Sequence, residues 1–571
     1  MLRAAIVAYF VVIAGPIALS QTQTDTETTS EALSRAPADV PLPVLSSEQR
    51  QAMIENFENL IEDAEGVTDN NPPGSPGSPL VQDPEVSLIE IPSADATQSS
   101  SLPPSGGESE RPKPASATIL PPSSPDELVI GKKVTNPNLP GNTIVVEPSV
   151  SNMSLSVFYL SNDRADYSSD GGKTFSTLNI PGGPPAAPNF CCDQTIVFDP
   201  SRSIWIWSRL YINSASNTGI TQISVIKNPP KIGCTYNYNP SDSTNTYKVD
   251  YPQLGLSDNK VYLSTSEFVG KKWVRARMLR MDLDDIAACP PSVTARVAGY
   301  KPSTKRMWTP IRGAKRVMYW ANPEDNTHLR IWTWPEDDPN PTWVVKKVQP
   351  TANSNPDCRG GNNNQDWMEK KGWHLGEGIL RGALARGGTQ WKCPDCDRLQ
   401  FFWNSNKDST HLQAYVRSAV FDLPDLNVVA EPNIHRPDMC FGYADVHPNA
   451  RGDLGVTVAF GGKDGGNGRA LGAGVAIEDE YTKGFHINKV YVTSSGTDMP
   501  SSKNKSWDQR YGDYLSVKPD EPCSLWWIAG NYALRGGGGP KNVVGHYLEF
   551  GRYRDRNCWE RWNETVPESL P

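Results

Sequence analysis

Acidic residues recur near the first strand of several β-hairpin units that follow one another along the chain. Asp193, Asp250, Asp445 and Asp513 stand at or beside the start of such strands, and Glu377 precedes another. Two acids flanking a glycosidic bond suit hydrolysis, because one protonates the leaving oxygen and the other activates water or attacks the anomeric carbon. We therefore predict these five residues to be catalytic. The alternative interpretation is that they cap the turns where strands begin and line a hydrated channel.

A second group of residues suits uronic-acid chemistry. A polysaccharide lyase needs a cation to neutralise the sugar carboxylate, a base to remove the C5 proton, and a Tyr or His that acts as acid. Such side chains lie near predicted strand ends in two consecutive units: Arg381, Arg386, His435, Arg436, Tyr443 and His447. We predict Tyr443 and His435 to be catalytic. The predicted substrate-binding residues are Gln194, Gln253, Arg381, Arg436 and Tyr511. Chance is the competing explanation, because the chain contains many arginines.

Composition narrows the classes of partner and cofactor. The net charge is −9 and the basic residues are dispersed, so nucleic acid is not expected as a partner. The 17 Trp and 20 Tyr residues suit stacking on sugar rings, although aromatic residues also pack sheets. We predict extracellular polysaccharide or glycan as the partner. Neither His-Glu-x-x-His nor Gly-x-Ser-x-Gly occurs, and we expect no cofactor, with structural calcium left open.

The first twenty residues have the pattern of a secretory signal peptide. Arg3 precedes an apolar run from Ala4 to Leu19, and Ala18-Leu19-Ser20 resembles a cleavage site. An uncleaved membrane anchor is the alternative, but the run is short for a span. No later stretch reaches membrane length. We expect a secreted, extracellular protein (periplasmic in a Gram-negative bacterium) with no membrane span in the mature chain.

Ten cysteines follow this segment, and their even number in an exported chain favours disulfides over metal ligands. Cys393-Pro-Asp-Cys396 alone suggests redox or zinc chemistry, but no second close-spaced pair accompanies it. The sequence leaves the pairing of the cysteines undetermined.

Residues 21–125 are predicted to be a low-complexity stalk, because they are dense in Pro, Ser, Gly and acidic residues and poor in core-forming ones. One island interrupts this segment. Ser46 and Gln49 fit a capping box, and apolar residues then recur at helical spacing, which predicts an amphipathic helix near 47–64. This helix is expected to dock on the main domain or on a partner.

From residue 126 onward, short β runs alternate with turns rich in Gly, Pro, Asn and Asp. Gln194–Asp199 followed by Ile204–Ser208 is one such hairpin, and Asp250–Asp258 followed by Lys260–Ser264 is another. Repetition at tens of residues predicts an all-β propeller over 126–571. Seven candidate blades can be counted: 144–178, 191–226, 250–281, 314–335, 378–421, 442–492 and 512–550. Six blades, or a two-sheet sandwich, are the alternatives.

An octapeptide, Ser168-Ser-Asp-Gly-Gly-Lys-Thr-Phe175, fits the pattern Ser-x-Asp-x-Gly-x-Thr-Trp/Phe, the Asp-box. Together with Cys191-Cys-Asp-Gln194, Asp199-Pro200 and Tyr511-Gly-Asp-Tyr514, it resembles the sialidase-like (BNR-repeat) β-propeller superfamily. The resemblance implies the architecture. The Arg-Ile-Pro motif of true sialidases is absent, so no catalytic residue is carried over. Asp170 lies in a loop that the resemblance places far from the axis, and we expect it to be structural.

Two classes of function follow. The first is a secreted carbohydrate-active enzyme, either a glycoside hydrolase or a uronate-type lyase, favoured by acids and aromatics near the inner strands. The second is a non-catalytic glycan- or protein-binding propeller displayed on a stalk. Fold does not decide between them.

Overall fold

The computed structural model describes residues 27–35, 127–135 and 146–558. Gaps in the description lie at 163, 181, 214, 241–245, 271, 301–306, 352–357, 361–364, 367–379, 388–395, 465–466, 480–485, 492–513 and 535–542. The predicted signal peptide and the predicted helix near 47–64 therefore lie outside the described residues.

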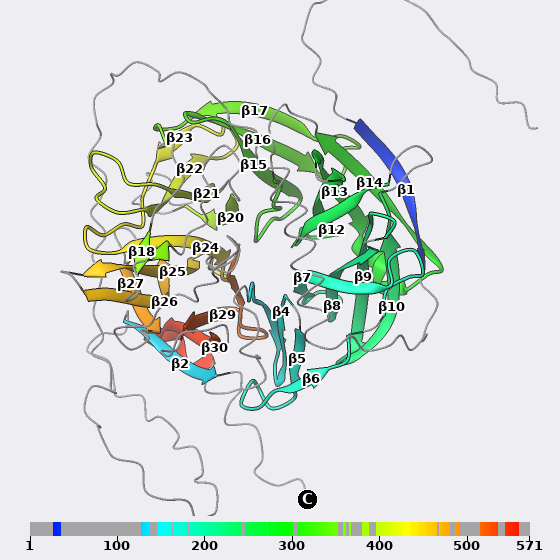
Figure 1. Ribbon diagram of the computed structural model, residues 1–571, viewed down its shortest axis with the longest axis horizontal. Coiled ribbons are helices and arrows are strands. Elements are labelled where there is room, and N and C mark those ends of the chain that lie inside the picture. The colour runs from blue at the N-terminus through cyan, green and yellow to red at the C-terminus, as the bar shows by residue number, and fades with distance from the viewer. Residues whose placement is uncertain are drawn as a thin grey trace, which may run out of the picture.

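Seven antiparallel blades surround a central axis (Figure 1). In each blade the strands follow one another outward as a meander, with the first strand innermost. Blade 1 consists of β3 (Ser149–Met153), β4 (Ser156–Ser161), β5 (Arg164–Ser168) and β6 (Ser176–Leu178). Blade 2 consists of β7 (Asn189–Asp199), β8 (Ile204–Asn213), β9 (Thr218–Asn228) and β10 (Lys231–Tyr238). Blade 3 consists of β11 (Lys248–Leu256), β12 (Lys260–Val269), β13 (Lys272–Asp282) and β14 (Ser292–Tyr300).

The remaining four blades complete the circle. Blade 4 consists of β15 (Val317–Asp325), β16 (His328–Pro335) and β17 (Thr342–Lys347), and blade 5 of β20 (Arg381–Arg386), β21 (Asp397–Ser405), β22 (Tyr415–Asp422) and β23 (Val428–Ala430). Blade 6 consists of β24 (Cys440–Pro448), β25 (Leu454–Asp464), β26 (Asn467–Glu478) and β27 (His486–Tyr491). Blade 7 consists of β28 (Ser516–Pro519), β29 (Trp527–Leu534), β30 (Val543–Arg552) and β2 (Leu128–Thr135). The minor elements are β18 (Arg359–Gly360), β19 (Gln365–Asp366), α2 (Leu283–Ala288) and the 3-10 helix η4 (Tyr553–Asp555). Among the described residues, no helix is long and apolar enough to cross a membrane.

Both ends of the described propeller build blade 7. Strand β2 precedes blade 1 in the chain but pairs antiparallel with β30, the last strand, from Leu128 opposite Arg552 to Thr135 opposite His546. Strand β2 thereby covers the outer edge of β30, and the two ends of the propeller are joined within one blade.

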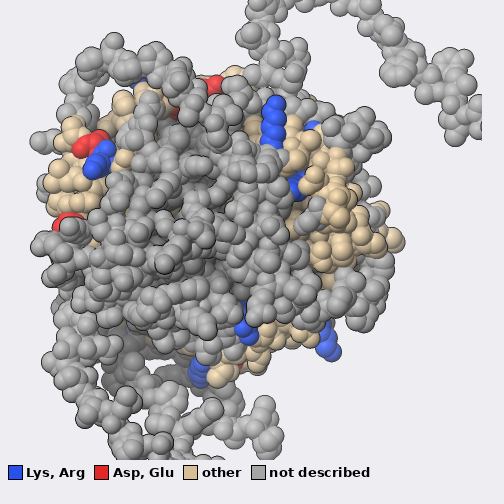
Figure 2. All heavy atoms as spheres, viewed as in Figure 1, with Lys and Arg blue, Asp and Glu red and all other residues tan. Residues whose placement is uncertain are grey.

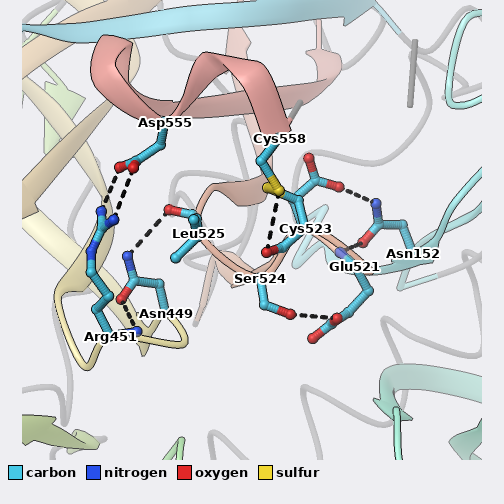
Figure 3. Close-up of a disulfide and its surroundings, with 10 residues drawn as sticks. Asn152, Asn449, Arg451, Glu521, Cys523, Ser524, Leu525, Asp555 and Cys558 are labelled. Atoms are coloured by element: carbon cyan, nitrogen blue, oxygen red, sulfur yellow. Dashed lines mark hydrogen bonds and ion pairs between the residues drawn. A yellow bond between two sulfur atoms is a disulfide. The ribbon is translucent and has the colours of Figure 1, made fainter. Parts of the chain in front are cut away.

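Side-chain bonds tie this closing blade to its neighbours at the turns that follow the inner strands (Figure 3). Asn152 of blade 1 donates its amide to Asp520 Oδ1 at 2.6 Å. A disulfide joins Cys523, in the β28–β29 turn, to Cys558, which follows the last strand in the sequence. Arg451, in the β24–β25 turn of blade 6, donates to Asp555 of η4 at 2.8 Å. Blades 6, 7 and 1 are thus cross-linked at one end of the axis.

Disulfides confirm the sequence expectation for the cysteines. The bonded pairs are Cys191–Cys192, Cys234–Cys289, Cys358–Cys440 and Cys523–Cys558. Cys396, which belongs to the close-spaced pair, is disulfide-bonded as well.

Much of the aromatic content packs between blades. Trp308, Trp320, Trp332 and Trp334 are each at most 1% exposed and belong to one apolar cluster. The rings of Trp320 and Trp332 stack with centroids 5.7 Å apart. These residues therefore take the packing role that the sequence left as the alternative to sugar stacking.

The Asp-box forms the turn between β5 and β6, the outer strands of blade 1. The Asp170 carboxylate accepts hydrogen bonds from the Thr174 amide at 2.9 Å and the Thr174 hydroxyl at 2.6 Å. Gly171 and Gly172 have φ of 72° and 79°, and Phe175 packs against Tyr547. The structural role predicted for Asp170 is confirmed.

The predicted blades match the observed inner strands better than the outer ones. The fourth strands of blades 2 and 3, β10 and β14, lie beyond the predicted limits, as do β17 and β23. A further strand, β1 (Glu27–Arg35), lies in the predicted stalk and pairs with β14 and the end of β10 (Figure 1). Strands β17 and β23 contain no buried position, so no pattern of buried apolar residues marks them in the sequence.

Replacing Asp170 by alanine should lower the free energy of unfolding by about 1–3 kcal/mol, because the carboxylate bonds that shape the turn are lost. Chemical denaturation measures the change. Asp337→Ala removes an aspartate whose side chain is 81% exposed and is the matched control. Equal losses in the two variants would contradict the role of the Asp-box turn.

Stability should also depend on Asp520. Burial, with the nearby charge of Glu549, raises the pKa of Asp520 to about 8. The folded state therefore holds a proton that the unfolded state releases near pH 4, so this contribution is full below pH 4 and is lost as the pH rises to about 8. Asp520→Asn keeps the acceptor for Asn152 and should flatten the fall in melting temperature between pH 5 and 8. An unchanged slope, like that expected of Asp337→Asn, would refute this assignment.

Candidate functional site

Equivalent residues of the inner strands lie at common levels along the axis, and hydrogen bonds between blades define the middle level. Asp445 Oδ2 accepts from the Val517 amide of blade 7 at 2.9 Å. Ser516 Oγ accepts from the Val150 amide of blade 1 at 3.1 Å, and Ser149 Oγ accepts from the Ile196 amide of blade 2 at 3.1 Å. At these three successive junctions, one side chain of the inner strand thus holds the backbone of the next blade.

Two predicted substrate-binding residues meet at this middle level. Arg381 of β20 donates from Nη1 to Gln253 Oε1 of β11 at 2.6 Å, although blade 4 separates their blades. Its Nε lies 3.9 Å from Asp445 Oδ1. Arg381, Gln253 and Asp445 are each at most 3% exposed. The structure therefore brings together three of the residues that the sequence singled out.

The level nearer the start of the inner strands is shaped by unusual backbone. Glu147, Asp193, Tyr251 and Tyr443 lie two residues before the middle level in blades 1, 2, 3 and 6, with φ between 36° and 55°. Strands β7, β11 and β24 each carry a register shift at this point. Such bulges re-aim side chains, and left-handed backbone at non-glycine residues is typical of functional sites.

Two tyrosines of this level cover Arg381. The Arg381 guanidinium lies 5.7 Å from the ring centre of Tyr251 and 5.3 Å from that of Tyr514. The two rings meet edge-on at 5.9 Å. Burial raises the pKa of the Tyr514 hydroxyl, and the charges of Asp193 and Glu147 add to the rise. This hydroxyl is therefore protonated at neutral pH.

Donors in this group lack acceptors. Arg381 Nη2, Gln253 Nε2 and the Tyr514 hydroxyl are buried and make no hydrogen bond within the described part of the chain. Buried polar groups are nearly always satisfied in proteins, so unsatisfied donors that converge on one place indicate a ligand or bound water.

The predicted acids are bound to backbone amides. Asp193 Oδ2 and Asp250 Oδ1 both accept from the Tyr251 amide, at 3.1 and 2.8 Å, and Asp445 accepts from Val517. These contacts match the turn-capping interpretation. Glu377, Asp513 and Tyr511 lie outside the described residues.

Other predicted site residues are engaged elsewhere. Gln194 donates to the Ser161 carbonyl at 2.6 Å and accepts from Trp207 Nε1 at 3.1 Å, between blades 1 and 2. The Tyr443 amide donates to Asn404 Oδ1 at 2.9 Å, and its ring belongs to a buried apolar cluster.

His435 and Arg436 lie in the connection from blade 5 to blade 6. The His435 ring meets that of His411 edge-on at 4.6 Å. Arg436 Nε pairs with Asp438 at 2.6 Å. The described contacts of both residues are thus with blade 5 and with their own loop.

Three basic residues form a deeper level, and of these the sequence had singled out His447 but not Arg312 or Lys518. Lys518 and His447 lie two residues beyond Ser516 and Asp445 on their strands, and Arg312 bridges to Ala383 of β20. Arg312 and Lys518 are 6% and 7% exposed. Aligning the hairpin units on their turns would have revealed Lys518 and His447 as equivalent positions.

No group of three or more His, Cys, Asp and Glu residues within the described ranges could hold a metal ion. Basic side chains on the described part of the face in Figure 2 occur at separate places around the rim.

No family model and no curated protein matches the sequence. Similar solved structures include an α-L-arabinofuranosidase from Fusarium graminearum with an iminosugar inhibitor (9% identity, 73% of this chain and 96% of that chain, TM-score 0.34). Another is an α-L-arabinanase from Penicillium chrysogenum with arabinobiose (9% identity, 74% of this chain and 98% of that chain, TM-score 0.33). A third is Trypanosoma rangeli sialidase with sialic acid (9% identity, 76% of this chain and 60% of that chain, TM-score 0.32).

The seven blades and the Asp-box turn of blade 1 give the chain a sialidase-like β-propeller architecture.

The hydrogen bonds between inner strands should be important for stability. Ser149→Ala leaves the buried Ile196 amide without its acceptor, and we expect a loss of about 1–3 kcal/mol in the free energy of unfolding. Ser176→Ala changes an exposed serine of β6 and should have little effect. If denaturant titration gives both variants the same midpoint, the middle-level bonds do not stabilise the ring.

Proposed function

We propose that the chain is a secreted carbohydrate-active enzyme that cleaves an acidic extracellular polysaccharide by β-elimination, at the end of the axis where the inner strands begin. One observation carries this proposal. Arg381 Nη2 and the Tyr514 hydroxyl are buried, lack described acceptors, and belong to side chains in contact. A cation beside a protonated tyrosine suits a sugar that carries a carboxylate.

The chemistry assigns a role to each group. Arg381 neutralises the uronate carboxylate, which makes the C5 proton more acidic. The Asp193 carboxylate, whose charge acts on Tyr514, takes that proton. The C4–O4 bond breaks, a C4=C5 double bond forms, and the Tyr514 hydroxyl gives its proton to the leaving oxygen. The raised pKa of Tyr514 keeps this proton in place until the leaving oxygen needs it.

Secretion belongs to the same proposal. The disulfide-rich chain suits an oxidising compartment, where an extracellular polysaccharide would be met.

A non-catalytic glycan-binding propeller is the second candidate. The hydrogen bonds that backbone amides donate to Asp193, Asp250 and Asp445 favour this candidate, because a carboxylate that accepts from backbone donors is a weaker base. Hydrolysis by two of these acids is the third outcome that the assay must distinguish.

Incubation with a panel of acidic and neutral polysaccharides tests the proposal. Elimination yields products that absorb in the ultraviolet, from acidic substrates only. New reducing ends without this absorbance would indicate hydrolysis, and retention without cleavage would indicate a binder. Either of these results overturns the lyase proposal.

Tyr514→Phe should lower turnover by about 10²- to 10⁴-fold on the substrate that the panel identifies. The fold should be unaffected, because the missing hydroxyl makes no described bond. Tyr167→Phe, on β5 of blade 1, removes a hydroxyl that bonds only locally to Ser156 and should retain full activity. Activity of Tyr514→Phe equal to that of Tyr167→Phe would exclude Tyr514 as the acid.

A further inference from the structure

The deeper level of the axis contains a concentration of buried positive charge. Arg312 and Lys518 interact electrostatically with each other and with Arg381, and Asp445 is the carboxylate among the described residues that acts on both. One Asp445 oxygen already accepts from Val517, and the other faces Arg381. Within the described part of the chain, three basic side chains therefore face one carboxylate. Burying an uncompensated charge costs several kcal/mol.

The basic groups of this level also have unused donors. Arg312 Nη1 donates to the Leu254 carbonyl, but Nε is buried without an acceptor in the described residues. Lys518 is buried as well, and Asp445 is the carboxylate among the described residues that acts on its charge. Burial holds the pKa of Lys518 well below its ordinary value, with Arg312 and Arg381 adding to the fall. A bound anion would supply the missing acceptor and the missing charge.

Contacts across the axis restrict the size of such an anion. Gly313, next to Arg312, has φ of 69°, and a Cβ placed on it would lie 2.2 Å from Pro448 Cγ. Blades 4 and 6 therefore meet beside this level. On the other side, the bond between Arg381 and Gln253 spans blades 5 and 3. Close contacts between blades at this level favour a small ligand over a large one.

We propose that Arg312 and Lys518 bind a halide ion, chloride in physiological media, with His447 beside it. The His447 imidazole donates from Nδ1 to the Pro448 carbonyl at 2.8 Å, which fixes its ring next to both cations. The site lies beyond the Arg381–Gln253 bond from the proposed polysaccharide site. It is structural, since the ion neutralises charge between blades 4, 6 and 7, and it does not depend on the proposed activity.

Two measurements on the full chain test the halide. Crystals grown in sodium bromide should give an anomalous peak within hydrogen-bond distance of Lys518 Nζ and Arg312 Nε. The melting temperature should rise with chloride or bromide concentration, relative to sodium gluconate at equal ionic strength.

Lys518→Met removes one ligand and the buried charge, and this variant should lose most of the halide-dependent rise. Lys315→Met, which removes an exposed lysine paired with Asp397, should retain it. Absence of the bromide peak, or an unchanged halide response in Lys518→Met, overturns the proposal. A rise produced by sulfate and not by halide would also overturn it, because the site would then be built for a larger anion.

Discussion

The inner strands are held in register by side chains that accept amide hydrogens from the following blade. Asp445, Ser516 and Ser149 repeat this contact through four consecutive blades. Because the contact recurs at the same place in each strand, alternate residues above and below it reach the axis at matching levels. Three levels follow from this one alignment: the level of Asp193 and Tyr514 nearer the strand starts, the middle level of Arg381, and the deeper level of basic residues.

Asp445 shows how closely structure and chemistry overlap in this arrangement. One of its oxygens holds blade 7, and the other faces the guanidinium of Arg381. The same carboxylate balances part of the charge of Arg312 and Lys518. Replacing Asp445 would therefore disturb the contact with blade 7 and the charge balance of the basic level at the same time.

The sequence was sufficient for the architecture and for part of the site. Hairpin spacing and the Asp-box predicted a propeller, and Arg381, Gln253 and Asp445 were found together as predicted side chains near the axis. Tyr514, Arg312 and Lys518 were missed, because recognising them requires the level at which each strand is held, and this depends on bonds between blades. Outer strands such as β17 and β23 were missed because they contain no buried position that would give an apolar pattern.

Closure through β2 and β30 has a consequence for how the chain reaches its native state. Lys132 of β2 bonds to Glu549 of β30, 417 positions away. During synthesis β2 emerges before any blade exists and finds its partner only when the last strand is complete. Until then the edge of β2 that pairs with β30 in the native structure has no partner strand. The pairing of β2 with β30, which closes the ring, therefore cannot form before the last strand has been made. Contacts of such long range in sequence are typical of slowly folding topologies.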